Sequence, residues 1–567
     1  MDSFFQTPPQ LHNQFTTDSA LQSCLRRLLP EEVLNDISPG LRSLGELAAG
    51  EMMTLAAAAE SQIPVHVPYD AWGQRVDEIR ISDAWSEMRR IAATEGIVAT
   101  AYERQHAEYS RIHQMTRLYL FHPSSAIYSC PLAMTDGAAR VLELMGDDAL
   151  KSRAFERLTT RDIKEFWTSG QWMTERTGGS DVGKSLSVAI PGERDGEWLL
   201  HGNKWFTSAV TSEMALTLAR TDDRVPGTRG LSLFYVEIRN QDGSLNGIEV
   251  RRLKDKLGTR ALPTAELDLN GTRATMLGDP GNGVRKAAAL LNITRSYNAI
   301  CAVGYMRRGI ALARDFSSRR EAFGRLLSQQ PLHLETLADL QTEFEGGLQL
   351  SMRLAELLGK EECNTASESE RALLRILTPL AKLSTGKQTV AVCSEILECF
   401  GGAGYVEDTG LPQLLRDAQV LPIWEGTTNI LSLDVLRAGE REGAVVPLFE
   451  DCKRLLEEVK SSSADKHLKD ARVQVEQSLS RLMEYCQQLP DLRPDAVQAG
   501  ARALALSLAR TYAGALLLNH AAWSIQNEGN DAVPRVEASR RWCRKPLAVL
   551  LSTDDTGLSD TASLALT

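Results

Sequence analysis

One carboxylate in the chain, Glu425, lies in a setting suited to acid–base chemistry. It is flanked by the apolar Ile423 and Trp424 on one side and by Gly426 on the other. The apolar pair can exclude water from the carboxylate, and a glycine lets backbone come close to a bound ligand because it has no Cβ. Such a carboxylate is a candidate general base, although the same pattern is also typical of an ordinary residue at a helix edge.

Three further segments carry residue types that suit a flat or phosphorylated ligand. In residues 173–181, two glycines stand beside hydroxyl side chains, which favours close backbone approach to a ring or a phosphate. In residues 204–208, two aromatics precede two hydroxyls, and this combination can wall an aromatic ring and hydrogen-bond its edge. In residues 320–324, Arg320 can clamp a pyrophosphate with its planar fork. A β-turn, an ordinary strand and a solvated arginine are the respective structural alternatives.

The elements that must position these segments follow from the hydrophobic pattern. Residues from about 20 to 166 have a mostly helical pattern, and helical periodicity returns at about residue 284. The second helical region contains the stripe Leu337, Leu340, Phe344 and Leu348 and is predicted to stop at the glycine pair 401–402. A charged break at residues 440–443 precedes a last helical segment to about residue 552, followed by a polar, loose tail.

The residue pattern in the middle of the chain is typical of a small β domain. Residues 198–206 predict two strands joined by a Gly-Asn turn, residues 230–238 are rich in β formers, and residues 265–271 alternate with period two. We therefore predict a mainly α protein with a central β domain, an α+β fold. Its parts are an N-terminal helical domain with an extended arm (1–167), a middle β domain (168–283), a helical bundle carrying Glu425 (284–441) and an additional C-terminal helical domain with a tail (442–567).

Composition and charge exclude several classes of protein. The chain has 567 residues, of which 43% are hydrophobic and 24% charged, as in globular proteins, and no apolar run reaches the roughly 18 residues of a membrane span. A net charge of −11 disfavours a general nucleic-acid binder. Nine dispersed cysteines without a C-x-x-C pair indicate reduced thiols in an intracellular protein, and no histidine spacing is typical of a metal site. The first 22 residues contain no arginine or lysine, which favours the cytoplasm over the mitochondrial matrix, the alternative compartment.

Together, and in this order, the motifs resemble the acyl-CoA dehydrogenase family. They read T-E-x-x-x-G-S-D (174–181), K-W-x-x-S (204–208), R-x-x-F-G (320–324), F-G-G-x-G (400–404) and R-D-x-x-x-x-x-I-x-E-G-T (416–427). The resemblance covers residues from about 20 to 440. It is closest to the branch of the bacterial adaptive-response protein AidB, because of residues 69–75, 252–258, 329–332 and 423–426 and because of the extra C-terminal segment.

The resemblance implies a flavoprotein of fatty acid metabolism that binds FAD and oxidises the Cα–Cβ bond of a fatty acyl-CoA, of medium to long chain, to the trans-2-enoyl-CoA. Glu425 matches the base that removes the α-proton, and its backbone N–H matches a donor to the thioester oxygen. The positions that match cofactor contacts in the same subunit are Met173, Thr174, Gly179, Ser180, Phe206, Thr207, Ser208, Thr427 and Asn429. Those that match substrate contacts are Ser180, Asn292, Arg295 and Gly426.

In this family FAD is shared between subunits, so the resemblance also implies a homo-oligomer, a dimer of dimers. The positions that match contacts from the partner subunit are Arg320, Phe323, Gln330, Glu398 and Gly402. Two of them depart from the usual residues, because Gln330 replaces a common histidine and Glu398 a common glutamine. An electron-transfer flavoprotein is the implied electron acceptor, and no metal is expected.

Two other functions stay open beside the dehydrogenase. One is an acyl-CoA binding or sequestering protein with little turnover that regulates lipid metabolism. The other is a DNA-associated protein, as the AidB resemblance allows, for which the only basic cluster comprises Arg535, Arg540, Arg541, Arg544 and Lys545. A solvated helix face or a subunit contact is the structural alternative for this cluster. The net negative charge of the chain makes a nucleic-acid partner the less favoured hypothesis.

Overall fold

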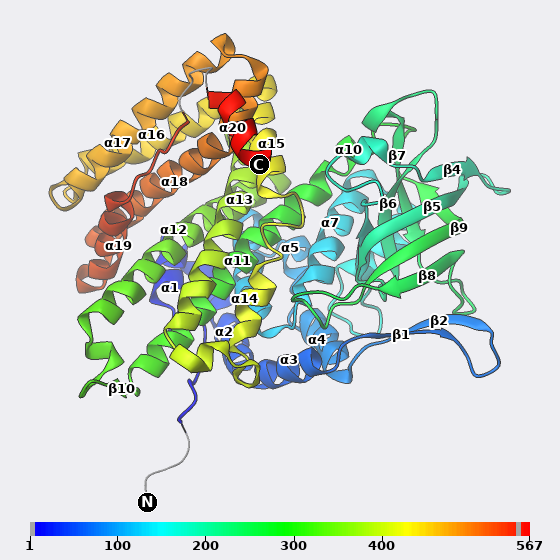
Figure 1. The fold of residues 1–567 in the computed structure, drawn as a ribbon, viewed down its shortest axis with the longest axis horizontal. Helices are drawn as coiled ribbons and strands as arrows, with labels where there is room; N and C mark the ends of the chain where they lie inside the picture. Colours follow the sequence, from blue (N-terminus) through cyan, green and yellow to red (C-terminus); the bar gives the residue numbers. More distant parts are fainter. Residues whose placement is uncertain (1–5, 552–556, 567) are drawn as a thin grey trace, which may run out of the picture.

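The computed structural model describes residues 6–551 and 557–566 of the chain. Its N-terminal part is a group of helices that packs against the long central helices of the molecule (Figure 1). These helices are α1 (Ser19–Leu28), α2 (Glu31–Ala49), α3 (Glu51–Ser61), α4 (Asp83–Thr94), α5 (Ala99–Glu103), α6 (Ser110–Phe121), α7 (Ser129–Met145), α8 (Asp148–Leu150) and α9 (Glu156–Leu158). Their apolar faces join one continuous core with the central helices.

This part also contains a β-hairpin that the helical pattern did not predict. Strands β1 (Val65–Tyr69) and β2 (Arg75–Arg80) pair antiparallel. The turn between them is held by Asp70, whose Oδ1 accepts hydrogen bonds from the backbone N–H groups of Trp72 and Gln74 at 2.8 and 2.9 Å. A short side chain that satisfies the backbone two residues on is a turn signal, and here it overrides the surrounding helical periodicity.

The middle of the chain is a seven-stranded sheet. Its strands are β3 (Ser169–Trp172), β4 (Val188–Pro191), β5 (Glu197–Ser208), β6 (Met214–Arg220), β7 (Leu231–Glu237), β8 (Ile248–Leu253) and β9 (Thr264–Met276). The order is β3-β6-β4-β5-β9-β7, β8 pairs with β9, and an additional β6–β7 pairing closes the sheet on itself. The predicted central β domain is thereby confirmed, and it lies at one end of the central helices (Figure 1).

The predicted turn at Gly202 and Asn203 is wrong, because β5 runs straight through both residues. Residues on either side of Gly202 pair with β9, with register shifts at residues 200–201 and 204–207. A Cβ on Gly202 would come within 2.4 Å of the Ser187 hydroxyl on the segment leading into β4. The glycine is therefore required for close approach of neighbouring backbone rather than for a reversal of the chain.

Long helices form the next part, and the Glu425 turn is built on them. Its elements are α10 (Gly283–Lys286), α11 (Ala288–Ser317), the hairpin β10 (Glu321–Ala322) and β11 (Arg325–Leu326), α12 (Pro331–Glu362), α13 (Glu368–Glu398), α14 (Leu411–Ala418) and α15 (Thr428–Glu442). The predicted apolar stripe of α12 is buried, and α13 ends three residues before Gly401, as expected. Ser367 and Glu370 form a capping box that satisfies the start of α13.

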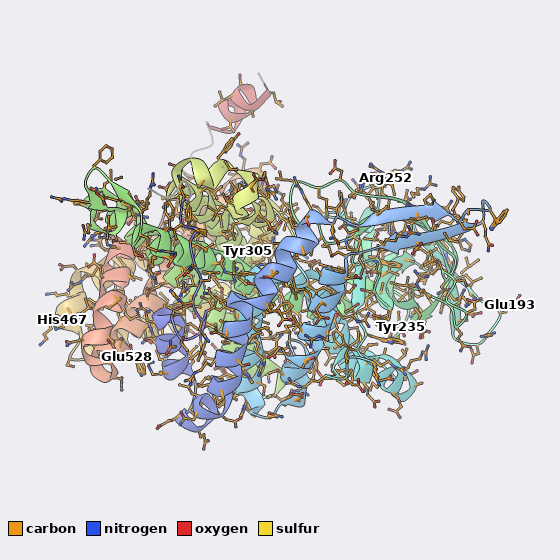
Figure 2. The ribbon with its side chains drawn as sticks, turned by 90° about the horizontal axis from the view of Figure 1, so that it is seen from below. Glu193, Tyr235, Arg252, Tyr305, His467 and Glu528 are labelled. Atoms are coloured by element: carbon orange, nitrogen blue, oxygen red, sulfur yellow. The ribbon has the colours of Figure 1, made fainter. Side chains whose placement is uncertain are left out.

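The last helices are α16 (Val445–Ser461), α17 (Asp465–Gln488), α18 (Pro494–Asn527), α19 (Val533–Arg544) and α20 (Gly557–Leu566). Of these, α16, α18 and α19 pack against α12, α13 or α15, and α17 packs on α16, α18 and α19. The expected loose tail lies partly in residues 552–556, outside the described residues, and residues 557–566 are helical instead. Figure 2 shows His467 and Glu528 of these helices at one end of the molecule and Arg252 of the β domain at the other. Within the described ranges, no helix combines the length and apolar character of a membrane span.

Candidate active site

Glu425 lies in a strained turn between α14 and α15. Its φ is +56° and that of Gly426 is +104°, so two consecutive residues occupy the left-handed half of conformational space. For a non-glycine residue this conformation costs about 1–3 kcal/mol and persists only where the surrounding structure imposes it. Here the surroundings do so from two long helices: Arg295 of α11 donates to the Glu425 carbonyl at 3.4 Å, and Lys382 of α13 donates to the Gly426 carbonyl at 2.6 Å.

The Glu425 carboxylate is oriented through one of its two oxygens. Thr294 of α11 donates its hydroxyl to Oε2 at 2.7 Å, and the side-chain amide of Gln171, in β3, lies 3.4 Å from the same atom. Oε1 and the backbone N–H of Glu425 make no hydrogen bond with any residue that the structure describes. A half-buried carboxylate with one oxygen held and the other free is arranged to accept a proton from a bound molecule.

Lys382 is fully buried beneath this turn, and its burial lowers its pKa to about 7. The neighbouring Glu425 carboxylate counteracts the effect by raising the pKa, whereas Arg295 adds to it. The protonation state of Lys382, which donates to the Gly426 carbonyl, therefore changes near neutral pH.

The wild-type protein is expected to gain stability from Lys382 as the pH rises. The unfolded chain holds this proton up to about pH 10.5, whereas the folded protein releases it near pH 7. Stability rises with pH wherever the unfolded state binds more protons, so the contribution of Lys382 is least favourable below about pH 7. The melting temperature of the wild type minus that of Lys382→Met should therefore increase from about pH 7 to about pH 9. Lys387→Met, at an exposed position of α13, is the control, and parallel curves for wild type and Lys382→Met would contradict the expectation.

Arg295 is engaged inside the protein. Its Nη1 lies 2.9 Å from Asp434 Oδ2, and Arg375 lies 2.8 Å from the other oxygen of the same carboxylate. Arg295 is thus oriented by Asp434 while it holds the Glu425 backbone. Asn292, one turn earlier on α11, is half-buried. Contacts of Arg295 and Asn292 with CoA stay a prediction.

The apolar neighbours of Glu425 do not shield it in the expected way. Ile423 is 60% exposed, so it does not exclude water from the carboxylate. Trp424 instead donates its indole N–H to the Asn298 side chain of α11, and Asn298 in turn donates to the Leu421 carbonyl at 3.1 Å. The sequence pattern places both residues beside Glu425, but in a left-handed turn adjacent side chains diverge.

The β domain contributes a second group of predicted residues. Thr174 and Trp205 lie side by side, because the Trp205 N–H donates to the Thr174 carbonyl at 3.0 Å. Phe206 is 57% exposed, and the ammonium of Lys254 lies 4.8 Å from its ring centroid and 3.7 Å from that of Trp205. Ser208 shares a hydrogen bond of 3.1 Å with the Thr264 hydroxyl.

The other predicted residues of this group differ in how accessible they are to a bound molecule. Thr207 is buried and donates to the Ala265 carbonyl at 2.6 Å, so its side chain belongs to the interior of the sheet. Met173 is half-buried, and Gly179 and Ser180 are exposed. A Cβ on Gly179 would meet the Thr174 hydroxyl at 2.4 Å, so only glycine fits beside it. At the start of α15, Thr427 is exposed and Asn429 accepts from Arg502 at 3.3 Å.

A buried ion pair holds this loop to the sheet. Lys204 Nζ lies 3.0 Å from Glu175 Oε1, and the two side chains are 0% and 1% exposed. Glu175 also accepts hydrogen bonds from the backbone N–H groups of Leu186 and Ser187. Burial by itself raises the pKa of the Glu175 carboxyl, but the Lys204 ammonium and these hydrogen bonds bring it below its ordinary value. The pair therefore fixes the position of residues 174–187.

The residues present fit a flavin. The β domain offers the 57% exposed ring of Phe206, the hydroxyl of Thr174 and, beside that hydroxyl, Gly179, where no larger residue fits. Gln171 of the same domain reaches the Glu425 carboxylate. The Oε1 atom of Gln171 is buried and finds no hydrogen-bond partner among the described residues, so an additional donor beside it would satisfy it.

The third group of predicted residues lies far from the first two. Arg320 and the 99% exposed Phe323 stand at the hairpin β10–β11, beyond the C-terminal end of α11, whereas Thr294 stands near its start. At about 1.5 Å per residue, the helix between them is about 35 Å long. Glu398, the last residue of α13, and Gly402, four residues further on, are both exposed. Figure 1 shows β10 at the opposite end of the long helices from the sheet. Gln330 stays near β10, donating to the Ala322 carbonyl at 2.8 Å.

Three residues that contact the Glu425 turn were missed by sequence reasoning. They are Gln171, Thr294 and Lys382. A usable signal existed for the last two: each is a polar side chain at an inward position of a long helix otherwise lined by apolar residues. A buried polar residue needs a partner, and that partner is often functional.

The basic cluster near the C-terminus does not form a free positive surface. Arg535 is 4% exposed and pairs with Glu345 at 3.1 Å, and Arg541 pairs with Glu335 at 2.7 Å. Arg544 and Lys545 also face carboxylates, and Arg540 donates to the His467 carbonyl. Each of these charges is used within the chain, so the cluster gives no support to nucleic-acid binding.

The fold is that of a flavin-dependent oxidoreductase. Family profiles agree. Residues 170–272 match "Acyl-CoA dehydrogenase, middle domain", and residues 281–439 match "Acyl-CoA dehydrogenase, C-terminal domain". Residues 6–164 match "Adaptive response protein AidB N-terminal domain", and residues 444–566 match "Acyl-CoA dehydrogenase 11 C-terminal domain-like". The chain belongs to the acyl-CoA dehydrogenase family, whose members are FAD-dependent oxidoreductases.

Individual relatives give the same result. The chain is 45% identical to acyl-CoA dehydrogenase family member 11 of Caenorhabditis elegans, over 96% of this chain and 89% of that protein. It is 32% identical to AidB of Escherichia coli (strain K12), over 79% of this chain and 82% of that protein. The crystal structure of C. elegans ACDH-11 in complex with C11-CoA superimposes with a TM-score of 0.94, at 42% identity, covering 100% of this chain and 97% of that one. The expected fold, AidB-like branch, reaction class and FAD cofactor are thereby confirmed.

Proposed function

We propose that this protein oxidises the Cα–Cβ bond of a medium- to long-chain fatty acyl-CoA, with Glu425 as the base that removes the α-proton. The observation that carries the proposal is the free Oε1 of a carboxylate whose other oxygen is oriented by Thr294. The complex of the C. elegans relative with C11-CoA supports an acyl-CoA as the ligand and a chain of this size.

The Glu425 turn contributes more than its carboxylate. The backbone N–H of Glu425 has no partner among the described residues, so it can donate to a thioester carbonyl oxygen. This bond would strengthen as negative charge develops on that oxygen during loss of the α-proton. Lys382 and Arg295 hold the two carbonyl groups of the turn, so the N–H and the carboxylate keep a constant relation to each other.

Bound FAD supplies the acceptor for the hydride from Cβ. The residues that would hold its ring are Thr174, Phe206 and Ser208, with the Lys254 ammonium close to the aromatic wall. Gly179 and Ser180 form the exposed part of the loop that would approach the cofactor. These residues would orient the ring and exclude water from it.

A complete cofactor site requires a second copy of the chain. Arg320, Phe323, Gln330, Glu398 and Gly402 lie beyond the far ends of α11 and α13, so one chain cannot bring them to the Glu425 turn. Phe323 is 99% exposed on the single chain, so its ring is accessible to a second copy. We therefore place these residues against the cofactor of the partner subunit, in a dimer or a dimer of dimers.

Replacing Arg320 by glutamine is expected to weaken FAD binding by about 10- to 100-fold, because a charge-assisted hydrogen bond contributes about 1.5–3 kcal/mol. Arg319→Gln is the matched control, since Arg319 already pairs with Asp315 inside the chain. FAD titration measures the affinity, and native mass spectrometry measures the subunit number and the FAD content. Unchanged FAD affinity in Arg320→Gln, or a monomer that retains FAD, would contradict the shared site.

Anaerobic mixing of the purified holoprotein with acyl-CoAs of short, branched, medium and long chains tests the function. Bleaching of the flavin absorbance, fastest with medium or long chains and accompanied by the 2-enoyl product, is the expected result. Tight binding of all these ligands without bleaching would favour a sequestering protein that holds acyl-CoA with little turnover.

The electron acceptor and the compartment are the last parts of the proposal. A reduced flavin that is shielded from water needs a redox partner, and we propose an electron-transfer flavoprotein. All nine cysteines lie in the described part of the chain and are free, which supports a reducing compartment inside the cell, and we propose the cytoplasm.

A further inference from the structure

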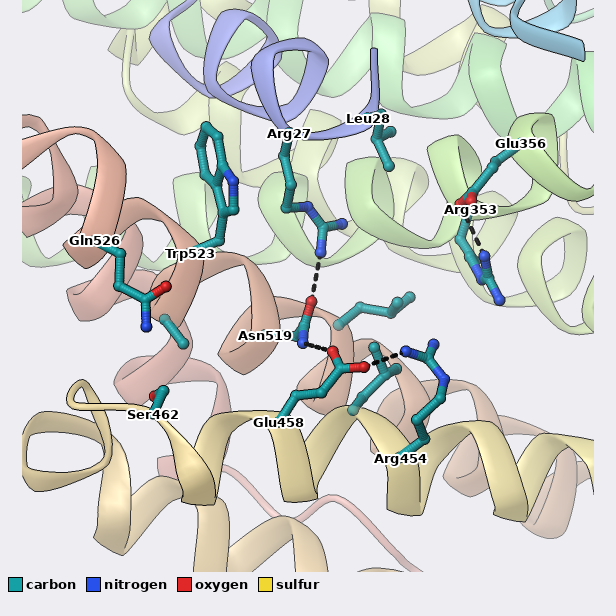
Figure 3. A pocket seen from close by; sticks show the side chains of 13 residues that line it. Arg27, Leu28, Arg353, Glu356, Arg454, Glu458, Ser462, Asn519, Trp523 and Gln526 are labelled. Carbon is teal, nitrogen blue, oxygen red and sulfur yellow. Dashed lines mark hydrogen bonds and ion pairs between the residues drawn. The ribbon is translucent and has the colours of Figure 1, made fainter. Parts of the chain in front are cut away.

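A cavity separates the C-terminal helices from the core of the molecule. It has a volume of about 330 Å³ and lies between α1 and α12 on one side and α16 and α18 on the other (Figure 3). Charged side chains enter it from three of these helices, and apolar side chains complete the wall. None of its lining residues belongs to the predicted active site.

One of the charges in this cavity has no carboxylate partner among the residues that the structure describes. Arg27 of α1 donates to two neutral amide oxygens, Asn519 at 2.7 Å and Gln349 at 3.0 Å. Its Nε atom is buried and has no hydrogen-bond partner among the described residues. The two other arginines of the cavity differ, because Arg353 pairs with Glu356 at 2.8 Å and Arg454 pairs with Glu458 at 2.6 Å.

The surroundings of Arg27 make its positive charge costly. Burial lowers the pKa of its guanidinium below the ordinary value, and the nearest carboxylates are already used by other arginines. Arg27 is half-buried, and a charge that is partly removed from water without a counter-charge destabilises the structure around it. An anion in the adjoining cavity would offset this cost, and the planar guanidinium is the side chain best suited to a carboxylate.

The rest of the lining suits a small apolar body. Leu28, Leu455, Leu516 and Trp523 contribute apolar surface. Since a water molecule occupies about 30 Å³ of liquid, the cavity has room for roughly ten non-hydrogen atoms. We propose that this cavity binds a small organic carboxylate, with its anionic group at Arg27 and its apolar part against Trp523 and the leucines.

This site is separate from the Glu425 turn and joins two parts of the chain. Arg502, near the start of α18, contacts Asn429 beside that turn, and Asn519 stands 17 positions further on, about 25 Å along the helix. The ligand would touch α1 and α12 of the core and α16 and α18 of the C-terminal segment at once. Its binding therefore stabilises the contact between them, independently of acyl-CoA.

Benzoate, which carries one carboxylate on a ring of suitable size, is the probe, and benzamide is its uncharged match. Calorimetric titration of the FAD-loaded protein should show one saturable benzoate site per chain and at least about tenfold weaker binding of benzamide. Arg27→Gln should weaken benzoate by at least about tenfold. Arg26→Gln is the control: Arg26 is adjacent, already pairs with Glu528 and does not line the cavity, so benzoate affinity should stay unchanged.

Hydrogen exchange locates the benzoate site in the molecule and tests the proposal even if Arg27→Gln fails to fold. Benzoate should protect residues 454–462 and 516–526 in the wild type, and saturation of the protein with an acyl-CoA should leave this protection intact. No saturable binding, equal binding of benzoate and benzamide, unchanged affinity in folded Arg27→Gln, or protection confined to the Glu425 turn would each overturn the proposal.

Discussion

Replacing Glu425 by glutamine is expected to slow flavin reduction by acyl-CoA by about 10²–10⁴-fold, the usual loss when a general base is removed. Glutamine keeps the size of the side chain and an oxygen that can still accept the Thr294 hydroxyl. It lacks only the basic oxygen that takes the proton. Acyl-CoA affinity should change little, because glutamine keeps the size and the hydrogen-bonding groups of the side chain, so the loss should appear in the rate and not in binding.

Stopped-flow bleaching under anaerobic conditions, together with an equilibrium binding measurement, separates these two quantities. Glu440→Gln is the matched control, since Glu440 is an exposed carboxylate on α15, the helix that follows the same turn. Equal bleaching rates in Glu425→Gln and the wild type would reject Glu425 as the base. Weakened binding with an unchanged rate would assign Glu425 to ligand contact alone.

Replacing Lys204 by methionine is expected to destabilise the protein by about 3–5 kcal/mol, the typical cost of breaking a buried ion pair by removing one partner. Methionine fills the space of the lysine, but Glu175 remains as a buried carboxylate without its counter-charge. Because the same pair fixes residues 174–187, FAD affinity should fall together with stability. Denaturant unfolding and FAD titration measure the two effects.

The pH dependence of this variant follows from the sign of the Glu175 shift. In the wild type the pKa of Glu175 is lowered, so the stability from the ion pair is present above the ordinary value of 4.5 and is lost as the pH falls through the folded-state pKa. Without Lys204, burial favours the protonated carboxyl. The stability difference between wild type and Lys204→Met should therefore be larger near neutrality than in acid.

The same β domain provides a control for this prediction. Lys184→Met removes an exposed lysine that lies 3.5 Å from Asp181, in the loop next to the predicted flavin edge. Exposed pairs contribute about 0–1 kcal/mol, so this variant should remain close to the wild type. A loss for Lys204→Met no larger than that for Lys184→Met would show that Lys204 and Glu175 do not hold the loop.

The local patterns of the chain were enough to predict the main architecture. Apolar residues spaced as on a helix face placed the long helices, and the buried Leu337, Leu340, Phe344 and Leu348 show why: a stripe of this kind has to be covered. The failures were also local. Asp70 closes a hairpin within a helical pattern, and Gly202 serves close packing within a continuous strand. Each of these residue types occurs in more than one kind of local structure. The residues that surround it in the folded protein decide which one forms.

The amino-acid sequence determined which residue types stand in the motifs and therefore the family and the cofactor. The arrangement of those motifs was decided by the tertiary structure alone. Folding brings Thr294 and Lys382 from two helices to the Glu425 turn, and it separates the Arg320 group from that turn by the length of α11. It also leaves Arg27 beside a cavity without a carboxylate partner. The physical reason is that hydrogen bonds and ion pairs act over a few ångströms, so their partners depend on how the helices pack and not on spacing along the chain.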